Sequence, residues 1–261
     1  MTNTDVLVEE RAGVIHVTLN RPDRRNALSD TVLDRLLEVT AELRPGVRAI
    51  VIRGAGGMFC AGGDIKQFQS ALQGAPAEEI AAYNRRYGTI LEALDVAPAP
   101  VIAVVEGAAM GGGMGLASVA DVTIASADTQ FALTETKLGL IPAQICAFVV
   151  QRIGEHQSRR LMLTASRFGA VEALRIGLAD VVSDDVDAAL QEVLSEIAVC
   201  APGANAMTKR LVADAVSERR RTEVLDRAAA LFAESMLADE AHEGVRSFTE
   251  RRTPPWAKAT L

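Results

Sequence analysis

The stretch Val101–Ala117, VIAVVEGAAMGGGMGLA, shows how this chain is built. Its first five residues, Val101–Val105, are apolar without alternation, which is typical of a strand buried on both faces of a sheet. Three consecutive glycines, Gly111–Gly113, then lead into an apolar run that we expect to be helical. A buried strand that passes through a glycine turn into a helix is typical of α/β layer architecture.

The same alternation continues on both sides of this stretch. The β-branched runs Val14–Leu19, Ala49–Arg53 and Val122–Ala125 are predicted strands. Between the first two, Ser29 is the expected cap of a helix that reaches about Leu43. The apolar residues of that helix recur at helical spacing: Val32, Leu33, Leu36, Leu37 and Val39. The predicted fold class is therefore α/β.

The last third of the chain changes character. From about Ala188 to Leu237 the pattern is helical, with a break near Pro202–Gly203. We therefore predict an α/β body over residues 1–186 and an α-helical C-terminal subdomain over residues 187–261. No low-complexity linker separates the two parts, so we expect them to pack together.

Composition and charge exclude several classes of protein. The chain has 261 residues and a net charge of −7, and a general nucleic-acid surface usually shows as a basic stripe. The N-terminus has no basic start followed by an apolar stretch, so a signal peptide is not expected. Glu106, several glycines and prolines interrupt the most apolar region, so a membrane span is not expected either. An odd, sparse set of three cysteines, Cys60, Cys146 and Cys200, indicates a reducing compartment, and we predict a cytoplasmic protein.

Metal and phosphate-loop chemistry are not expected either. The histidines, His16, His156 and His242, lie far apart in the sequence. The motifs GxxxxGK[ST], GxSxG and GxGxxG are absent.

Two glycine-bearing segments, each after an apolar strand, are the candidates for chemistry. They are Met58–Lys66 (MFCAGGDIK) and Glu106–Ala117 (EGAAMGGGMGLA). Glycines let backbone N–H groups approach a ligand closely, and a helix N-terminus adds the positive end of its dipole. Two such N–H groups converging on one oxygen form an oxyanion hole. The alternative is that both segments are structural turns.

The motifs NRPDRRNAL, FCAGGDIK, EGAAMGGGMGLA and FALTETKLGLIP, in this order, resemble the crotonase (enoyl-CoA hydratase/isomerase) superfamily. The resemblance runs from Val14 to the terminal RRTPPW. It implies a crotonase-like spiral of ββα turns, followed by a helical region that mediates trimer formation. It also implies an acyl-CoA thioester ligand, with no cofactor beyond the CoA of the substrate and no metal. We accordingly expect a homotrimer or a dimer of trimers, with no nucleic-acid or membrane partner.

Carried over by resemblance, the oxyanion donors are the N–H groups of Gly63 and Gly112, and the acid/base is Glu135. An apolar setting would raise the pKa of a glutamate and suit it to giving up a proton near neutrality. Without that chemistry, Glu135 would be a glutamate placed at a helix start by the helix dipole. The expected substrate contacts are Arg25, Ala27, Ala61, Asp64, Ile65, Lys66 and Gly115, and Arg24 would add positive charge for the CoA phosphates.

The sequence also departs from the family pattern. Gly115 stands where typical hydratases carry their first catalytic glutamate, so the two-carboxylate mechanism is incomplete. If the geometry admits a side chain, we expect Gly115→Glu to raise activity on crotonyl-CoA. The segment GLIPAQICAFVV resembles the form found in hydratases of glutaconyl-type thioesters.

Three functions remain open at this point. The first is an enoyl-CoA hydratase for a branched or carboxylated 2-enoyl-CoA, in which the substrate carboxylate or another polar group helps to place the water. The second is a Δ3,Δ2-enoyl-CoA isomerase, and the third is a CoA-ester binding protein with reduced catalysis.

Overall fold

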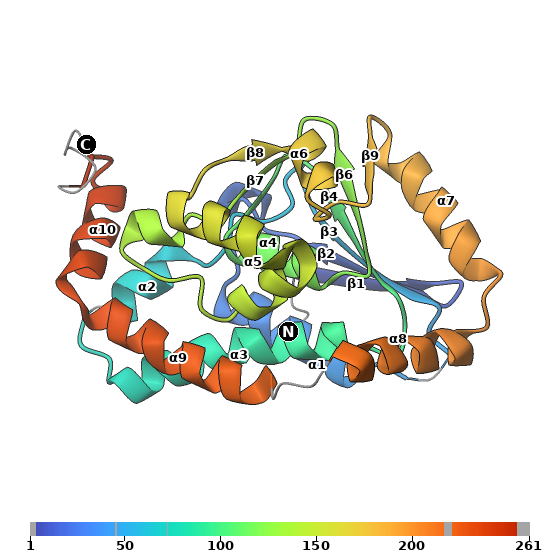
Figure 1. The fold of residues 1–261 in the computed structure, drawn as a ribbon, viewed down its shortest axis with the longest axis horizontal. Coiled ribbons are helices and arrows are strands. Elements are labelled where there is room, and N and C mark those ends of the chain that lie inside the picture. Colours follow the sequence, from blue (N-terminus) through green and yellow to red (C-terminus); the bar gives the residue numbers. More distant parts are fainter. Residues whose placement is uncertain (1–3, 45, 72, 217–220, 255–261) are drawn as a thin grey trace.

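A six-stranded sheet forms the centre of the computed structural model, which describes residues 4–44, 46–71, 73–216 and 221–254 (Figure 1). The strand order is β1-β2-β3-β4-β6-β9. β1 and β2 are antiparallel, and each later neighbour is parallel. The strands are β1 (Val6–Arg11), β2 (Val14–Leu19), β3 (Ala49–Gly54), β4 (Val101–Val105), β6 (Val122–Ser126) and β9 (Val181–Ser183).

A second, three-stranded sheet lies beside the first, as β5, β7 and β8. Its strands are short: β5 (Ala108–Met110), β7 (Gln130–Ala132) and β8 (Phe168–Gly169). β5 follows β4 after two residues, so the chain passes directly from the large sheet to the small one. This step brings the glycine triplet to the start of the next helix, α4 (Gly112–Val119).

Both faces of the large sheet are covered by apolar side chains. On β4, Val101, Ala103 and Val105 pack into the largest hydrophobic cluster, while Ile102 and Val104 pack into a second one on the opposite face. The helix α7 (Val186–Ala198) supplies the partners on that opposite face. Burial on two faces explains why the strand is apolar without alternation.

The remaining helices surround this core. In Figure 1, α9 runs alongside α3, and the two are in contact, while α10 lies at the end of the molecule that carries the C-terminus. The helices are α1 (Asp30–Ala41), α2 (Ile65–Ala71), α3 (Ala77–Asp95), α5 (Cys146–Thr164), α6 (Ala170–Arg175), α8 (Pro202–Val216), α9 (Arg221–Leu237) and α10 (Asp239–Thr249), with 3₁₀ turns η1 (Pro22–Arg24) and η2 (Glu135–Leu138).

Most predicted elements are confirmed. The four predicted strands appear as β2, β3, β4 and β6, and the predicted helix after Ser29 is α1. The Ser29 hydroxyl accepts a hydrogen bond from the Val32 N–H at 3.4 Å, which is the N-cap expected from the sequence. The helical region breaks between α7 and α8, close to Pro202, and α10 adds a helix after Leu237 that the pattern did not predict. The domain division at residue 186 stays a prediction, and α7, just beyond it, packs on the sheet.

Candidate active site

Three loops meet at the carboxyl edge of the parallel strands, where α/β sheets usually bind ligands. They follow β2, β3 and β4. Isolated parallel bridges tie them together, Leu28 to Gly63 and Cys60 to Ala109. Residues far apart in the sequence are therefore held side by side by backbone hydrogen bonds.

Two backbone N–H groups beside the bridges, those of Gly63 and Gly112, are available for a ligand. The Leu28 N–H donates to the Gly62 carbonyl at 2.8 Å, and the Asp64 N–H donates to the Leu28 carbonyl at 3.2 Å. The bridge thus uses the atoms on either side of Gly63 and leaves the Gly63 N–H outside it. Gly112 is the first residue of α4, so its N–H has no acceptor within the helix. Among the described residues, neither of these two N–H groups has a backbone acceptor, so both can donate to a ligand.

Gly62 brings these two donors close together. Its φ is +91°, a conformation that favours glycine, and a Cβ at this position would stand 2.8 Å from the Met110 carbonyl oxygen and 3.4 Å from the Gly112 nitrogen. The loop after β3 therefore touches the start of α4 backbone to backbone. Any side chain at Gly62 would push the loops apart.

Glu135 lies on the same cavity, at the start of η2. A Cβ on Gly111 would stand 2.7 Å from Glu135 Oε1, so the carboxyl group approaches the first turn of α4 through the space left by that glycine. The other oxygen, Oε2, is buried without a hydrogen-bond partner. Burial raises the pKa of Glu135 from 4.5 to about 7, although its own backbone N–H opposes the shift. A carboxyl group with this pKa exchanges protons readily near neutrality.

The cavity has a volume of about 120 Å³. Its lining combines polar side chains, such as those of Asn84, Thr134, Glu135 and Gln144, with apolar side chains such as Leu28, Phe68 and Ile141. Such a mixture is typical of a small-molecule site. The cavity is lined, among others, by Gly63, Gly112, Asn84, Tyr87, Glu135 and Gln144.

The predicted substrate contacts fall into two groups. Ala61 and Ile65 line the cavity with Gly63. Arg25 and Ala27 lie in the turn after β2, and Arg25 is exposed. The Ala61 N–H donates to the Arg25 carbonyl at 2.9 Å, which joins this turn to the loop after β3.

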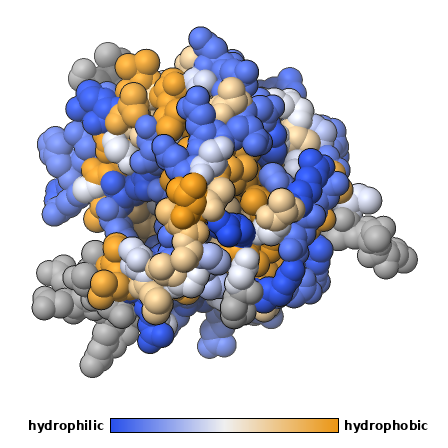
Figure 2. Space-filling view, turned by 90° about the vertical axis from the view of Figure 1, so that its right-hand side faces the viewer, coloured by the Kyte–Doolittle hydropathy of each residue, from blue (hydrophilic) through white to orange (hydrophobic). Residues whose placement is uncertain are grey.

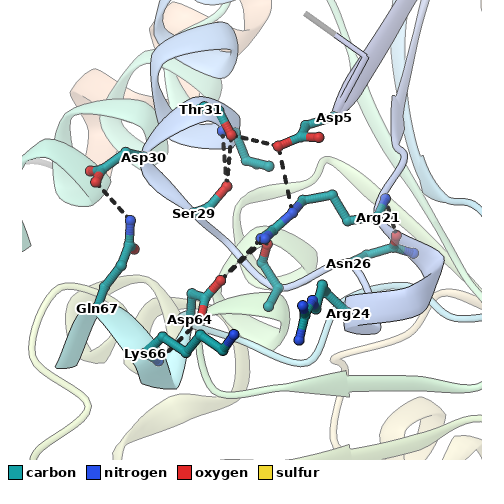
Figure 3. Close-up of polar contacts among 12 residues, drawn as sticks. Asp5, Arg21, Arg24, Asn26, Ser29, Asp30, Thr31, Asp64, Lys66 and Gln67 are labelled. Carbon is teal, nitrogen blue, oxygen red and sulfur yellow. Dashed lines mark hydrogen bonds and ion pairs between the residues drawn. The ribbon is translucent and has the colours of Figure 1, made fainter. Parts of the chain in front are cut away.

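The charged side chains beside the cavity form an ordered cluster (Figure 3). The Arg21 guanidinium donates to Asp64 at 3.2 Å and to the Ala27 carbonyl at 2.7 Å, and it also lies 3.5 Å from Asp5. Asp64 therefore makes an ion pair within the protein, while the side chains of Lys66 and Arg24 project toward the same region. Arg21 was not among the predicted contacts, and the structure shows that it fastens the turn to the AGGD loop.

Gly115 does not line the cavity. It is buried inside the first turns of α4, where a Cβ would stand 2.4 Å from Ile145 Cγ2 and 3.2 Å from the Tyr87 hydroxyl. The β-branched Ile145 fills the space into which a glutamate at this position would project. The condition for Gly115→Glu to raise activity on crotonyl-CoA, room for a side chain, is therefore not met.

We expect Gly115→Glu to destabilise the protein instead. Overpacking a buried site costs about 3 kcal/mol, and a domain of this size loses about 2–4 °C in Tm for each kcal/mol. Thermal unfolding of the variant should show this loss, with no gain in crotonyl-CoA hydration. The double variant Gly115→Glu/Ile145→Ala, which makes room beside position 115, should recover part of the stability. A single variant as stable as wild type would contradict the packing argument.

Sequence reasoning missed most of the residues that line the cavity, and four of them come from helices α3 and α9 or from the segment before α5. Asn84 and Tyr87 lie on α3, Gln144 precedes α5, and Phe232 lies on α9. The Tyr87 hydroxyl donates a hydrogen bond to the Gly112 carbonyl, so it supports the first turn of α4. The spacing of Tyr83, Tyr87, Ile90, Leu91 and Leu94 could have revealed α3, but nothing local shows that this helix faces the glycine loops.

Other chemistry has less support from the described residues. Within residues 4–44, 46–71, 73–216 and 221–254, no group of three or more histidine, cysteine or carboxylate side chains could hold a metal ion. The same part of the chain contains no helix long and apolar enough to cross a membrane. Burial raises the pKa of Cys60 to about 12, so its thiol stays protonated and is a poor nucleophile.

Comparison with known proteins shows the family of the chain. The family model for enoyl-CoA hydratase/isomerase matches residues 9–259. Pseudomonas aeruginosa AtuE is 48% identical, with a TM-score of 0.79 over 97% of this chain and 100% of its own. An enoyl-CoA hydratase from Mycobacterium avium is 31% identical, with a TM-score of 0.84 over 97% of this chain and 98% of its own. The enoyl-CoA hydratase AKT6-1 of Alternaria alternata is 31% identical over 97% of this chain and 84% of its own length. The chain belongs to the enoyl-CoA hydratase/isomerase family of the crotonase superfamily.

Proposed function

We propose that this CoA-ester enzyme is a hydratase that adds water to a 2-enoyl-CoA with a branched or carboxylated acyl group. One observation carries the proposal. A buried carboxyl group with a pKa of about 7, that of Glu135, shares one cavity with the unused N–H groups of Gly63 and Gly112. The first group can deliver a proton, and the other two can stabilise the negative oxygen that develops on a thioester carbonyl.

The proposed reaction uses these three groups together. The thioester oxygen accepts hydrogen bonds from the N–H groups of Gly63 and Gly112, and each such donor is worth about 3 kcal/mol in comparable sites. Protonated Glu135 gives its proton to the α-carbon while a water oxygen bonds to the β-carbon. The proton released from that water returns to the carboxylate, so Glu135 is regenerated. The products are a 3-hydroxyacyl-CoA and an unchanged enzyme.

Product mass tests this proposal. The protein is incubated with a panel of 2-enoyl-CoA and 3-enoyl-CoA esters that includes straight, branched and carboxylated acyl groups. Hydration adds the mass of one water, and isomerisation adds none. Conversion of 3-enoyl esters without any gain in mass would refute the hydratase and favour the isomerase. Ile145 also supports the isomerase, because it fills the space beside Gly115 that a second carboxylate would need.

The dependence of rate on pH separates the same two functions. Hydration needs the protonated form of Glu135, so kcat/KM should be flat below pH 7 and fall about tenfold per pH unit above it. Isomerisation begins with removal of an α-proton and needs the carboxylate, so its kcat/KM should rise up to pH 7 and then level off. Both expectations follow from the raised pKa of Glu135.

Initial rates between pH 5.5 and 9 measure this profile. If the Glu135→Gln variant keeps a residual rate, its kcat/KM should show no change of slope near pH 7. If kcat/KM of the wild-type protein shows no change of slope between pH 6 and 8, Glu135 is not the acid/base.

Assembly and location complete the proposal. Viewed from the right-hand side of Figure 1, hydrophobic side chains lie among hydrophilic ones on the surface (Figure 2). The exposed large apolar residues include Val199, Met207, Leu211 and Val212, on and just before α8. Met207 and Leu211 are one helical turn apart and share a face of α8. An exposed apolar face often marks an interface, which supports a homotrimer or a dimer of trimers, and sedimentation equilibrium measures the assembly directly. All three cysteines are free, which supports a cytoplasmic location.

A further inference from the structure

Three oxygens without partners surround the cavity. In the described part of the chain, four buried side-chain atoms have no hydrogen-bond partner, and three of them belong to residues that line this one cavity. They are Asn84 Oδ1, Glu135 Oε2 and Gln144 Oε1. Buried polar atoms are almost always hydrogen-bonded in folded proteins. The two amide oxygens can only accept, so this part of the cavity is built to hold a donor.

The orientation of Gln144 is fixed by its neighbours. Its side chain is 2% exposed, and its Nε2 donates to the Leu225 carbonyl at 3.1 Å. The amide oxygen must therefore point the other way, toward α3. Gly88 makes this possible, because a Cβ there would stand 2.0 Å from Gln144 Oε1.

Asn84 precedes Gly88 by one helical turn, so its side chain and the Gln144 oxygen lie on the same face of α3. No described residue that lines the cavity is cationic, and Glu135 is the one charged group among them. Arg85 also comes near Gly88, but its guanidinium donates to Glu92 at 2.7 Å, to Asp226 at 3.0 Å and to the Thr89 hydroxyl at 3.2 Å. The donor that these oxygens accept from is therefore a small neutral molecule.

We infer that Gln144 and Asn84 hold the water that attacks the β-carbon, in place of the carboxylate that Gly115 lacks. The inference rests on the proposed function. A buried water typically makes about three hydrogen bonds to polar groups that otherwise have no partner, and a cavity of about 120 Å³ has room for several waters. When the two amide oxygens accept the hydrogen atoms of a water, a lone pair of the water oxygen stays free to attack the β-carbon.

The amides do not remove a proton in this scheme. The water oxygen forms the new bond to the β-carbon, and the electron pair of the double bond moves through the enolate to the α-carbon, which takes the proton of Glu135. The released water proton passes to Glu135, directly or through a second water. Gln144 and Asn84 are thus positioning residues, and their effect should fall on hydration alone.

Exchange of α-protons gives the readout that separates positioning from structure. When a saturated acyl-CoA is bound in D₂O, Glu135 exchanges its α-protons for deuterons while the oxyanion donors stabilise the enolate. This reaction adds no water to a double bond. We expect Gln144→Leu and Asn84→Leu to lower hydration about 10- to 100-fold, the size of effect that a misplaced reactant produces. Exchange should stay within about threefold of wild type.

Two further variants sharpen the comparison. Gln144→Glu, assayed at pH 6 where a buried carboxyl stays protonated, keeps a donor for Leu225 and an acceptor for the water, so it should retain hydration. Gln191→Leu makes the same chemical change at an exposed position on α7 and should change neither rate. A crystal structure of the full chain should also show an ordered water 2.7–3.2 Å from both Gln144 Oε1 and Asn84 Oδ1.

Distinct results overturn the inference and the proposed function. Equal loss of hydration and exchange in both leucine variants, no loss in either, or absence of the ordered water would overturn the positioning role. The proposed function is tested on the wild-type protein before any variant is made. If wild type exchanges α-protons but hydrates none of the thioesters, the hydratase is wrong, and the attacking role of this water is wrong with it.

Discussion

Glu135→Gln should lower turnover by about 100- to 10,000-fold, the contribution typical of general acid–base catalysis. Glutamine keeps the shape of the side chain and a hydrogen-bonding group, but it cannot deliver a proton to the α-carbon. Calorimetric titration with CoA should give wild-type affinity, because the loops that carry Arg25, Lys66 and the oxyanion donors are untouched. A variant with a near wild-type rate on every active thioester would show that Glu135 is not the acid/base.

The same substitution should stabilise the protein at alkaline pH. The pKa of Glu135 is raised from 4.5 to about 7 by burial, so folding favours the protonated form, and wild type loses stability as pH rises between these values. Above pH 7 the buried charge costs about 3 kcal/mol relative to a neutral glutamine. Glu135→Gln should therefore melt about 5–10 °C higher than wild type at pH 8 and equally at pH 4.5 or below.

Equal melting temperatures at both pH values would show that the carboxyl is better solvated than its buried Oε2 suggests. The combination of lower activity and higher stability is the expected mark of a group held in an unfavourable setting for its chemistry. A purely structural glutamate would show the opposite, with lost stability and little change in rate.

Local patterns in the sequence were sufficient to predict four of the six strands of the large sheet. Val101–Val105 had to be buried on both faces because it has no polar side, and clusters on either side of β4 cover it. Ser29 was a recognisable cap, and the glycine triplet marked the start of α4. Each of these features depends on a few consecutive residues, so no knowledge of distant contacts was needed.

The polar end of the cavity could not be predicted in this way. Asn84 and Gln144 are 60 positions apart, and neither belongs to a motif. They line one cavity only because α3 and the segment before α5 pack together, as the approach of Gln144 to Gly88 shows. Gly115 was recognised as a departure from the family, but its consequence depended on Ile145, which fills the space beside it. Arg21 was passed over in favour of Arg24 and Arg25, since sequence does not show which arginine of the run turns inward to Asp64.

Gly112→Pro should lower turnover by about 100- to 1,000-fold, the cost of removing one oxyanion donor. Proline has no N–H, yet it is favoured at the first position of a helix, which is where Gly112 lies in α4. The matched control is Gly112→Ala, which keeps the N–H. Its Cβ would stand 3.0 Å from Leu28 Cδ1, the movable end of a leucine, so we expect turnover within about tenfold of wild type.

The two variants together decide whether the N–H of Gly112 or merely its small size matters. If both lose the same activity, space beside Leu28 and Tyr87 is the cause and the oxyanion role is wrong. If proline alone loses activity while its melting temperature and CoA affinity match those of alanine, the lost hydrogen bond is the cause. Because this bond strengthens as charge develops on the thioester oxygen, the loss should appear in kcat, with KM changing little.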